Sequence, residues 1–483
     1  MEAGLPVNRL TRADTPRPKT GIVHLGLGAF FRGFGCVYTA DAMTASGGDW
    51  GIVGVSMRSP TVHDALAPQG WAYTSVMLAP EGAKVRMIDV LNDVLIAPEN
   101  PDAVLAAMAD ADVKIVSLTV TEKGYCHNPA TGFLNPNHPD IIHDLSHPSP
   151  VSAPGFLVRA LQMRREAGLA PFTVLTCDNL PENGKLVRGI VLDLARRIDP
   201  TLADWIADQA TFPATMVDRI TPATTDDDIA LVARLTGYHD AAPVMHEPFS
   251  QWAIEDNFIG GARPDWAAAG AEMVADVTLH ENMKLRMLNG THSALAYLGY
   301  LGGYETISAV IEDAVYAGFV SQLWAKEIAP CVRAPQGVSL DAYASALVDR
   351  YANPAIKHRT WQIAMDGSQK LPQRILGTLA YNMARNIPSP RLCLTIAAWI
   401  RYVSGTDEMG QPIDVRDPMT ERLRDVTAAG LTPSAKAAAV LAMTEIFPAE
   451  LAVQIAPMVI SATEQIWKSG ARRAIVEIAG NQL

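Results

Sequence analysis

The sequence predicts an α/β fold in which a parallel sheet with crossover helices is followed by a mostly helical domain. In the first half of the chain, short β-branched runs alternate with helical segments, which is typical of parallel strands joined by helices. After about Asn282, long Ala- and Leu-rich helical segments dominate. A chain of 483 residues also exceeds the usual size of one hydrophobic core. We therefore expect two domains, 1–275 and 276–483, with the junction near residues 270–282.

Four buried strands and two helices define the expected sheet domain. Apolar runs predict the strands Gly21–Leu27, Trp50–Met57, Val113–Val120 and Phe172–Cys177. Helices are expected over Ala29–Ser46, directly after the first strand, and over Gly155–Gly168, before the fourth. In a doubly wound sheet, ligands bind beyond the carboxyl ends of the strands. The loops that follow these strands are therefore the first candidates for a site.

The composition excludes several classes of partner. The net charge of −12 argues against nucleic acid and anionic membranes. The five cysteines are scattered and form no C-x-x-C pair, which suits reduced thiols in the cytoplasm better than disulfides or a zinc ribbon. Neither an apolar run of about 18 residues nor an N-terminal signal core is evident. We expect a cytoplasmic protein, monomeric or alternatively homodimeric, that acts on a small molecule.

The segment from Lys284 to His292, K-L-R-M-L-N-G-T-H, places an amine, a carboxamide and an imidazole in an otherwise apolar helix. At about 100° per residue, Asn289 lies about 140° and His292 about 80° around the helix axis from Lys284, so all three can face one pocket. Gly290 costs roughly 1 kcal/mol against alanine in a helix interior, which predicts a close approach to the backbone there.

These groups suit the oxidation of a secondary alcohol, which requires a base and donors for the developing oxyanion. Lys284 can be the base if burial lowers its pKa from about 10.4 toward about 7–8. Asn289 and Asn179, the latter after the fourth strand, would then hold the alkoxide, and His292 would orient the substrate. No H-E-x-x-H or Cys/His cluster indicates a catalytic metal. The structural alternative is a lysine with an exposed amine and a buried histidine with hydrogen-bond partners.

A dinucleotide site is expected where Gly26-Leu27-Gly28 ends the first strand and opens a helix, because glycines let a pyrophosphate approach the backbone there. Phe31 occupies the third glycine position of the usual motif. The second strand lacks the terminal acid that normally binds the ribose of NAD, and Arg58 follows instead, which leaves NADP open. The expected cofactor contacts are Gly26, Gly28, Phe30, Arg32, Arg58, Thr121 and Glu122.

Two further segments carry candidate polar contacts. After the fourth strand, Asp178 and Asn183 are expected to cap the following helix. The polar stretch 358–374 contains Arg359, Lys370 and Arg374, and arginine suits a carboxylate because its guanidinium is bidentate. This stretch therefore predicts the binding of an anionic substrate, with ordinary surface ion pairs as the alternative and Arg286 as a further candidate.

Together these segments resemble the mannitol dehydrogenase family of polyol-specific long-chain dehydrogenases. The resemblance rests on the K-x-x-x-x-N-x-x-H pattern, preceded by Glu281, and on GIVHLGLGAF, IVSLTVTEKGYC, TCDNLPENG, MVDRITP, EPFSQWAIEDNF and the stretch 358–374. It implies an expanded Rossmann-type N-terminal domain, a mostly α-helical C-terminal domain, a cleft between them, and catalysis without a metal. One departure is F-F-R-G-F-G after Ala29, where the family commonly has F-H-R-A-H-Q.

The same resemblance implies roles for individual residues. Lys284 would be the general base, Asn179 and Asn289 the oxyanion hole and His292 a substrate contact, with Asp218 and Glu281 as secondary polar residues. The segment after Lys284 and the stretch 358–374 are most similar to members that act on sugar acids. They imply NAD-dependent interconversion of D-fructuronate and D-mannonate. The alternatives are mannitol and fructose, or tagaturonate. Another alternative is a protein that binds its ligand without turnover. Such a protein would not need the lysine, yet this sequence retains Lys284.

Overall fold

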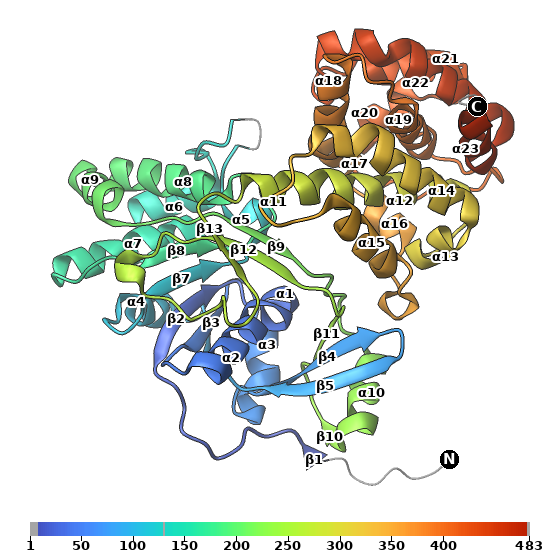
Figure 1. The fold of residues 1–483 in the computed structure, drawn as a ribbon. Coiled ribbons are helices and arrows are strands. Elements are labelled where there is room, and N and C mark those ends of the chain that lie inside the picture. The colour runs from blue at the N-terminus through green and yellow to red at the C-terminus, as the bar shows by residue number, and fades with distance from the viewer. Residues whose placement is uncertain (1–7, 129–130, 481–483) are drawn as a thin grey trace. The chain divides into compact units, whose positions relative to one another are not determined.

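The computed structural model describes residues 8–128 and 131–480, and the chain divides into two compact units, Met1–Thr278 and Leu279–Leu483 (Figure 1). The first unit contains the β-sheets, and the second consists of helices. The predicted fold class, an α/β N-terminal part with a mostly helical C-terminal part, is confirmed. None of the helices in the described part of the chain has the length and apolar character needed to cross a membrane.

The first unit is built around a five-stranded parallel sheet with the order β6-β3-β2-β7-β8. Its strands are β2(Thr20–Leu25), β3(Gly51–Ser56), β6(Leu91–Ile96), β7(Ile115–Leu118) and β8(Thr173–Thr176). Four of them coincide with the predicted strands. β6 was not predicted, because its sequence, L-N-D-V-L-I, interrupts the apolar run with two polar residues.

Both faces of this sheet are buried, which explains the nearly continuous apolar sequences of its strands. Val23 and Leu25 contribute to one hydrophobic cluster, whereas Ile22 contributes to a second one. Alternate residues of a strand point to opposite faces, so β2 anchors both clusters. The helices of this unit are α1(Ala29–Gly33), α2(Gly35–Ser46), α3(Thr61–Leu66), α4(Pro101–Ala109), α5(Thr121–Gly124), α6(Pro139–Ser146), α7(Ala153–Glu166), α8(Asn183–Ile198), α9(Pro200–Gln209) and α10(Asp226–Thr236).

The predicted helix Ala29–Ser46 is interrupted at Phe34, whose φ and ψ of −128° and −83° are not helical. The ring of Phe31 stacks on His24 with centroids 3.4 Å apart. A Cβ on Gly35 would lie 2.3 Å from the Phe31 ring. The aromatic residue at the third glycine position of the motif is therefore accommodated by a glycine four residues later.

Smaller sheets complete the first unit. β9(Thr215–Asp218), β12(Gln251–Glu255) and β13(Glu272–Val274) form one, and β11(Val244–His246), β4(Tyr73–Ala79) and β5(Gly82–Ile88) form another. The short strands β1(Asn8–Arg9) and β10(Tyr238–His239) pair in parallel.

The second unit packs its helices around α12(Thr291–Leu301) and α19(Pro390–Val403), both of which are almost entirely buried. The other α-helices are α11(Thr278–Met283), which spans the boundary, α13(Ile307–Glu312), α14(Ala314–Leu323), α15(Leu340–Tyr351), α16(Thr360–Ala364), α17(Gly367–Leu371), α18(Gly377–Met383), α20(Thr420–Val426), α21(Pro433–Leu441), α22(Ala449–Ser469) and α23(Ala471–Gly480).

Three segments of this unit are π-helices: η3(Lys284–Gly290), η4(Trp324–Ile328) and η7(Pro372–Leu376). η3 packs against both of the others. A Cβ on Gly290 would lie 2.9 Å from the carbonyl oxygen of Arg374 in η7. The close backbone approach predicted at Gly290 is therefore present, and the approaching group is the η7 backbone.

Candidate active site

The first unit contains a cavity of about 580 Å³ at the carboxyl ends of its central strands. The loops after β2, β3 and β7 line it with Gly26–Gly28, Ser56–Ser59 and Thr119–Thr121. This is the edge of a parallel sheet at which nucleotides bind. Gly26, Gly28, Arg58 and Thr121 of the predicted cofactor contacts line the cavity.

The two glycines of the first turn serve different purposes. Gly26 has a φ of +89°, and a Cβ there would lie 2.2 Å from the Thr119 carbonyl oxygen, so the fold itself requires glycine. Gly28 has an ordinary extended φ, and a Cβ there would have only one neighbour, 3.8 Å away. Packing leaves room for a side chain at Gly28, so glycine there keeps the helix N-terminus of α1 accessible. That arrangement fits a dinucleotide pyrophosphate.

The cavity wall carries more cationic than acidic side chains. Arg58 and Lys123 line it, whereas Asp140 is its one acidic lining residue in the described part of the chain. As predicted, no carboxylate follows β3. The site therefore lacks the usual acid partner for the ribose of NAD at that position.

Phe30, Arg32 and Glu122 lie outside the lining of this cavity. The Arg32 guanidinium is buried, donates a 2.6 Å hydrogen bond to the Ala242 carbonyl and lies over the ring of Tyr73. Phe30 stacks on Phe34 with centroids 5.1 Å apart. Glu122 is exposed on α5. Proximity in sequence to the turn therefore does not place these three side chains in the cavity lining.

The predicted caps of α8 are wrong, because its N-cap residue is Glu182, and Asp178 and Asn183 bind backbone groups of other segments. Asp178 accepts hydrogen bonds from the backbone N–H groups of Val120 and Thr121 and from the Tyr125 hydroxyl. Asn183 donates to the Thr215 carbonyl and accepts from the Thr215 N–H. Asp178 thereby fixes the turn after β7, where Thr121 adopts a strained φ of +64°.

Asn179 and Asp218, two predicted polar residues of the first unit, lie at or just after the carboxyl ends of strands. Asn179 is an exposed side chain three residues after the end of β8. Asp218 is the buried last residue of β9, paired with Gln251 of β12.

In the second unit, Lys284 and Asn289 are the first and sixth residues of the π-helix η3, and both are buried. In a π-helix, hydrogen bonds join residue i to residue i+5, which widens each turn. The residue five positions after Lys284 therefore lies about one turn above it. The α-helical spacing of about 140° is therefore wrong here. The π-helix places Lys284 and Asn289 closer to one side of the helix than an α-helix would, with Glu281 one turn earlier on α11.

Side chains from other elements donate hydrogen bonds to carbonyls of this π-helix. The Trp324 indole donates to the Met287 carbonyl at 3.2 Å, and the Tyr351 hydroxyl donates to the Leu288 carbonyl at 3.0 Å. The Trp324 indole also lies 2.7 Å from the Thr291 hydroxyl. These contacts tie η3 to η4 and α15.

His292 lies on α12 in a buried aromatic environment. Its ring is 4.8 Å from Tyr351 and 5.0 Å from His358. Burial, followed by the charges of nearby cations, lowers the pKa of His292 well below its usual value. Among the described residues, no group forms a hydrogen bond with its Nε2. A neutral imidazole with a buried, unsatisfied nitrogen is suited to hydrogen bonding with a ligand hydroxyl.

Three cationic side chains, Arg350, Lys370 and Arg374, lie close enough to this histidine that their charges lower its pKa. Arg350 is buried, whereas Lys370 and Arg374 are half-buried. Arg374 donates to the Ser293 hydroxyl at 3.3 Å, and the Lys370 amine donates to the Met365 carbonyl at 2.6 Å. The Asp366 carboxylate lies 3.8 Å from the Lys370 amine and offsets part of this charge. The remaining positive charge favours an anionic ligand.

Arg359 and Arg286 lie elsewhere. The Arg359 side chain is 60% exposed, and its guanidinium is 3.7 Å from the Glu305 carboxylate. Arg286 donates to the Cys331 carbonyl at 2.8 Å. Sequence reasoning missed Arg350, His358 and Tyr351. A signal existed for Arg350, because it stands beside Tyr351 in an amphipathic helix, but only the fold shows that it is buried.

Two family models match the chain, the mannitol dehydrogenase Rossmann domain over residues 20–268 and the mannitol dehydrogenase C-terminal domain over residues 276–468. D-mannonate oxidoreductase of Escherichia coli strain K12 is 43% identical and covers 99% of both chains. Mannitol 2-dehydrogenase of Neosartorya fischeri is 41% identical, over 85% of this chain and 84% of that protein. The solved ternary complex of Pseudomonas fluorescens mannitol 2-dehydrogenase with NAD and D-mannitol has a TM-score of 0.85 at 34% identity, covering 99% and 97% of the chains.

Proposed function

Because this chain belongs to the mannitol dehydrogenase family of oxidoreductases, we propose that it interconverts D-fructuronate and D-mannonate with NAD as cofactor. The observation that carries this proposal is the group of three cationic side chains near His292, namely Arg350, Lys370 and Arg374. These cations attract the carboxylate of a hexuronate, whereas a neutral polyol carries no charge for them to attract. The 43% identity to D-mannonate oxidoreductase agrees with it.

The proposed chemistry divides between proton transfer and oxyanion stabilisation. When bound at the cavity of the first unit, NADH supplies a hydride to the ketone carbon of the substrate. Lys284 donates a proton to the ketone oxygen in reduction and removes it in oxidation. The amides of Asn289 and Asn179 donate hydrogen bonds to that oxygen while it carries negative charge.

The remaining residues position the substrate. We assign a substrate hydroxyl to the neutral imidazole of His292, whose buried Nε2 requires a partner. Arg374 and Lys370 bind the carboxylate, and Asp218 and Glu281 supply polar contacts to the remaining hydroxyls. The alternative is a mannitol 2-dehydrogenase, supported by the 41% identity to the Neosartorya fischeri enzyme.

A panel of D-fructuronate, D-tagaturonate and D-fructose, each with NADH and NADPH, tests the function directly. We expect the highest kcat/KM for fructuronate with NADH. Fructose as the preferred substrate would contradict the acid-specific proposal and support the alternative. The assays with NADPH test whether the enzyme also accepts the 2′-phosphate of NADP. No acid follows β3 to repel this phosphate, and Arg58 would attract it.

Replacing Arg374 with alanine should lower kcat/KM for fructuronate by about 10- to 150-fold, the equivalent of one charge-assisted hydrogen bond of about 1.5–3 kcal/mol. Turnover of fructose by the same variant should change much less, since fructose has no carboxylate. Arg359→Ala is the matched control, because the Arg359 side chain is 60% exposed and faces Glu305. Equal losses of kcat/KM for fructuronate and for fructose would show that Arg374 does not bind the carboxylate.

Binding of D-mannonate should weaken as the pH rises through about 8. Burial, and then the charge of Arg374, lowers the pKa of Lys370 to about 8, while Asp366 and Asp417 oppose this shift. Below this pH the ammonium attracts the carboxylate, and above it the amine is neutral. Calorimetric titrations from pH 6.5 to 9.5 measure the effect, with D-mannitol as a neutral control. A pH-independent mannonate affinity would contradict the role of Lys370.

A further inference from the structure

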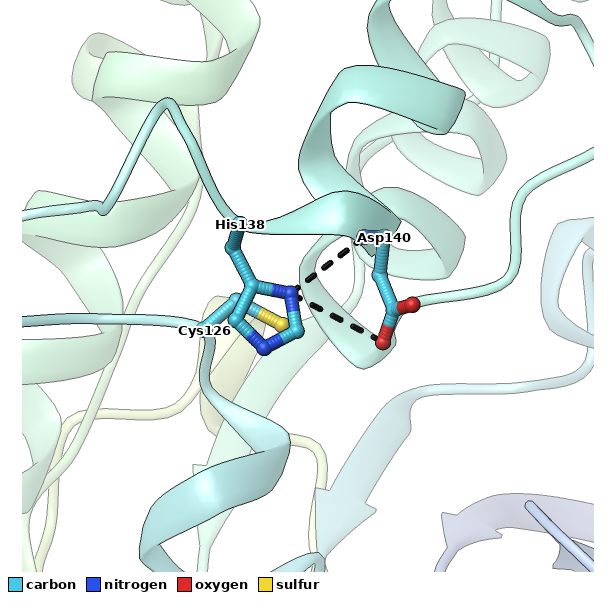
Figure 2. Close-up of side chains that lie close together, drawn as sticks. All are labelled: Cys126, His138 and Asp140. Carbon is cyan, nitrogen blue, oxygen red and sulfur yellow. Dashed lines mark hydrogen bonds and ion pairs between the residues drawn. The ribbon is translucent and has the colours of Figure 1, made fainter.

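Three side chains with metal-binding donor atoms lie close together in the first unit: Cys126, His138 and Asp140 (Figure 2). One donor atom from each lies within 4.8 Å of the others. The Nδ1 of His138 is 3.8 Å from the Asp140 carboxylate oxygen and accepts the N-cap hydrogen bond from the Asp140 N–H at 3.3 Å. A cation bound at Nδ1 would displace this hydrogen bond, whereas a cation bound at Nε2 would leave it in place. Ligands of a tetrahedral zinc ion are roughly 3.4–3.6 Å apart, given bond lengths of about 2.0–2.3 Å. Shifts of about an ångström would bring the three donors onto one ion.

Backbone hydrogen bonds hold the ligand-bearing segments in register. The Cys126 carbonyl accepts from the Asn135 N–H at 2.9 Å, and the Asn135 carbonyl accepts from the His138 N–H at 3.1 Å. His138 is the N-cap of α6, and Asp140 lies in the first turn of that helix. Twelve residues apart in sequence, Cys126 and His138 formed no recognisable metal motif, and only the fold brings them together.

The burial of the three side chains differs in a way that suits an open metal site. Cys126 is buried, whereas His138 and Asp140 are half-buried and line the same cavity as Gly26 and Gly28. A cation held by these three would keep a fourth position open to the cavity, as zinc sites with three protein ligands do. A thiolate and an imidazole select zinc or cadmium over magnesium or calcium.

We propose that Cys126, His138 and Asp140 bind a thiophilic divalent cation such as Zn²⁺, and that its binding competes with the dinucleotide. The competition follows because two of the ligands belong to the wall of the cavity at the strand ends. Cation binding stands independently of the proposed function, whereas the competition rests on the assignment of this cavity to NAD.

Zinc titration of the tag-free protein by calorimetry tests the site. Wild type should bind one equivalent, and Cys126→Ser and His138→Asn should each weaken binding about tenfold or more. Asparagine at His138 keeps an acceptor for the N-cap of α6. With Co²⁺ as the probe, wild type should show thiolate-to-cobalt charge-transfer absorption that Cys126→Ser lacks, which reports the ligand directly.

Two controls separate this site from other donors. The rings of His143 and His147 stack 4.3 Å apart on the surface and form a second potential zinc ligand pair. If zinc binds at Cys126, His138 and Asp140, the variants His147→Asn and Cys331→Ser should leave the zinc affinity unchanged. Loss of zinc binding in His147→Asn, or unchanged binding and unchanged cobalt absorption in Cys126→Ser, would overturn the proposal.

Fluorescence titration of NADH tests the competition. The apparent Kd of NADH should rise with zinc concentration in wild type and stay constant in Cys126→Ser. A zinc-independent Kd in wild type would overturn the competition. If NADH failed to bind in the absence of zinc, the proposed function would fail instead, and the calorimetric result would still decide the cation site.

Discussion

Replacement of Lys284 with methionine should lower kcat for fructuronate reduction by about 10²- to 10⁴-fold, the usual contribution of a general acid–base group. Methionine matches the length of the lysine and tolerates the buried position at the start of η3. The affinity for NADH should stay the same, because the proposed nucleotide cavity is built from residues of the first unit. Single-turnover oxidation of NADH, with fructuronate in excess, measures the chemical step.

A matched control and a rescue experiment distinguish proton transfer from structure. Lys326 is an exposed lysine in another π-helix, η4, and Lys326→Met should retain wild-type turnover. Added methylamine should partly restore the activity of Lys284→Ala, since a small amine can enter the space of the missing side chain. Full activity of Lys284→Met would exclude the lysine as the acid–base group.

The sequence singles out Lys284, Asn289 and His292 because polar residue types are rare in an apolar helix, and the structure shows all three buried. Their angular arrangement could not be predicted. A π-helical turn holds about one residue more than an α-helical turn, and this difference hardly alters the pattern of apolar residues in the sequence. In the structure this π-helix also receives hydrogen bonds from residues far away in sequence, because Trp324 and Tyr351 donate to the Met287 and Leu288 carbonyls.

The predicted carboxylate contacts show the same limit. The cation-rich stretch predicted Arg359, Lys370 and Arg374 as a group, but the structure separates them: Lys370 and Arg374 lie near His292, whereas Arg359 faces Glu305 at the surface. Arg350 lies on a different helix, α15. Residue type predicts which side chains can bind a carboxylate, whereas burial of a particular arginine follows from helix packing.

At the strand ends of the first unit, the outcome of a sequence prediction depends on whether local or tertiary contacts decide the structure. The G-x-G pattern after β2 located the cavity, because glycine requirements are local properties of the backbone. The acid and amide after β8 have a high preference for helix caps. Instead, Asp178 accepts hydrogen bonds from the turn after β7, and Asn183 exchanges two hydrogen bonds with Thr215 of β9.

The largest effect on stability is expected at Glu327, a fully buried carboxylate in η4. It accepts hydrogen bonds from the backbone N–H groups of Arg391 and Leu392, at 3.0 and 2.9 Å, and from the Arg391 guanidinium at 3.2 Å. These are the first N–H groups of α19, which begins at Pro390. Glu327→Ala leaves them and a buried guanidinium without their acceptor. We expect the free energy of unfolding to fall by about 3–5 kcal/mol.

Urea denaturation measures this loss, and hydrogen exchange of the α19 amides locates it. Glu421→Ala, an exposed glutamate in the first turn of α20, is the control and should change stability by less than about 0.5 kcal/mol. Equal protection of α19 in wild type and Glu327→Ala would show that the carboxylate does not cap this helix.

Glu327→Gln should cost less than Glu327→Ala, because glutamine keeps a carbonyl acceptor for the backbone groups and removes a buried charge. Burial raises the pKa of Glu327 to about 7, above its unfolded value of about 4.3. The folded state therefore binds more protons than the unfolded state between these values, and the contribution of this group to stability falls as the pH rises from about 4.3 to about 7. The difference in unfolding free energy between wild type and Glu327→Gln should consequently shift in favour of the glutamine variant over that range. A difference that stays constant from pH 4.5 to 7.5 would show that Glu327 keeps the same charge in both states, and that Arg391 and the helix N-terminus offset its burial completely.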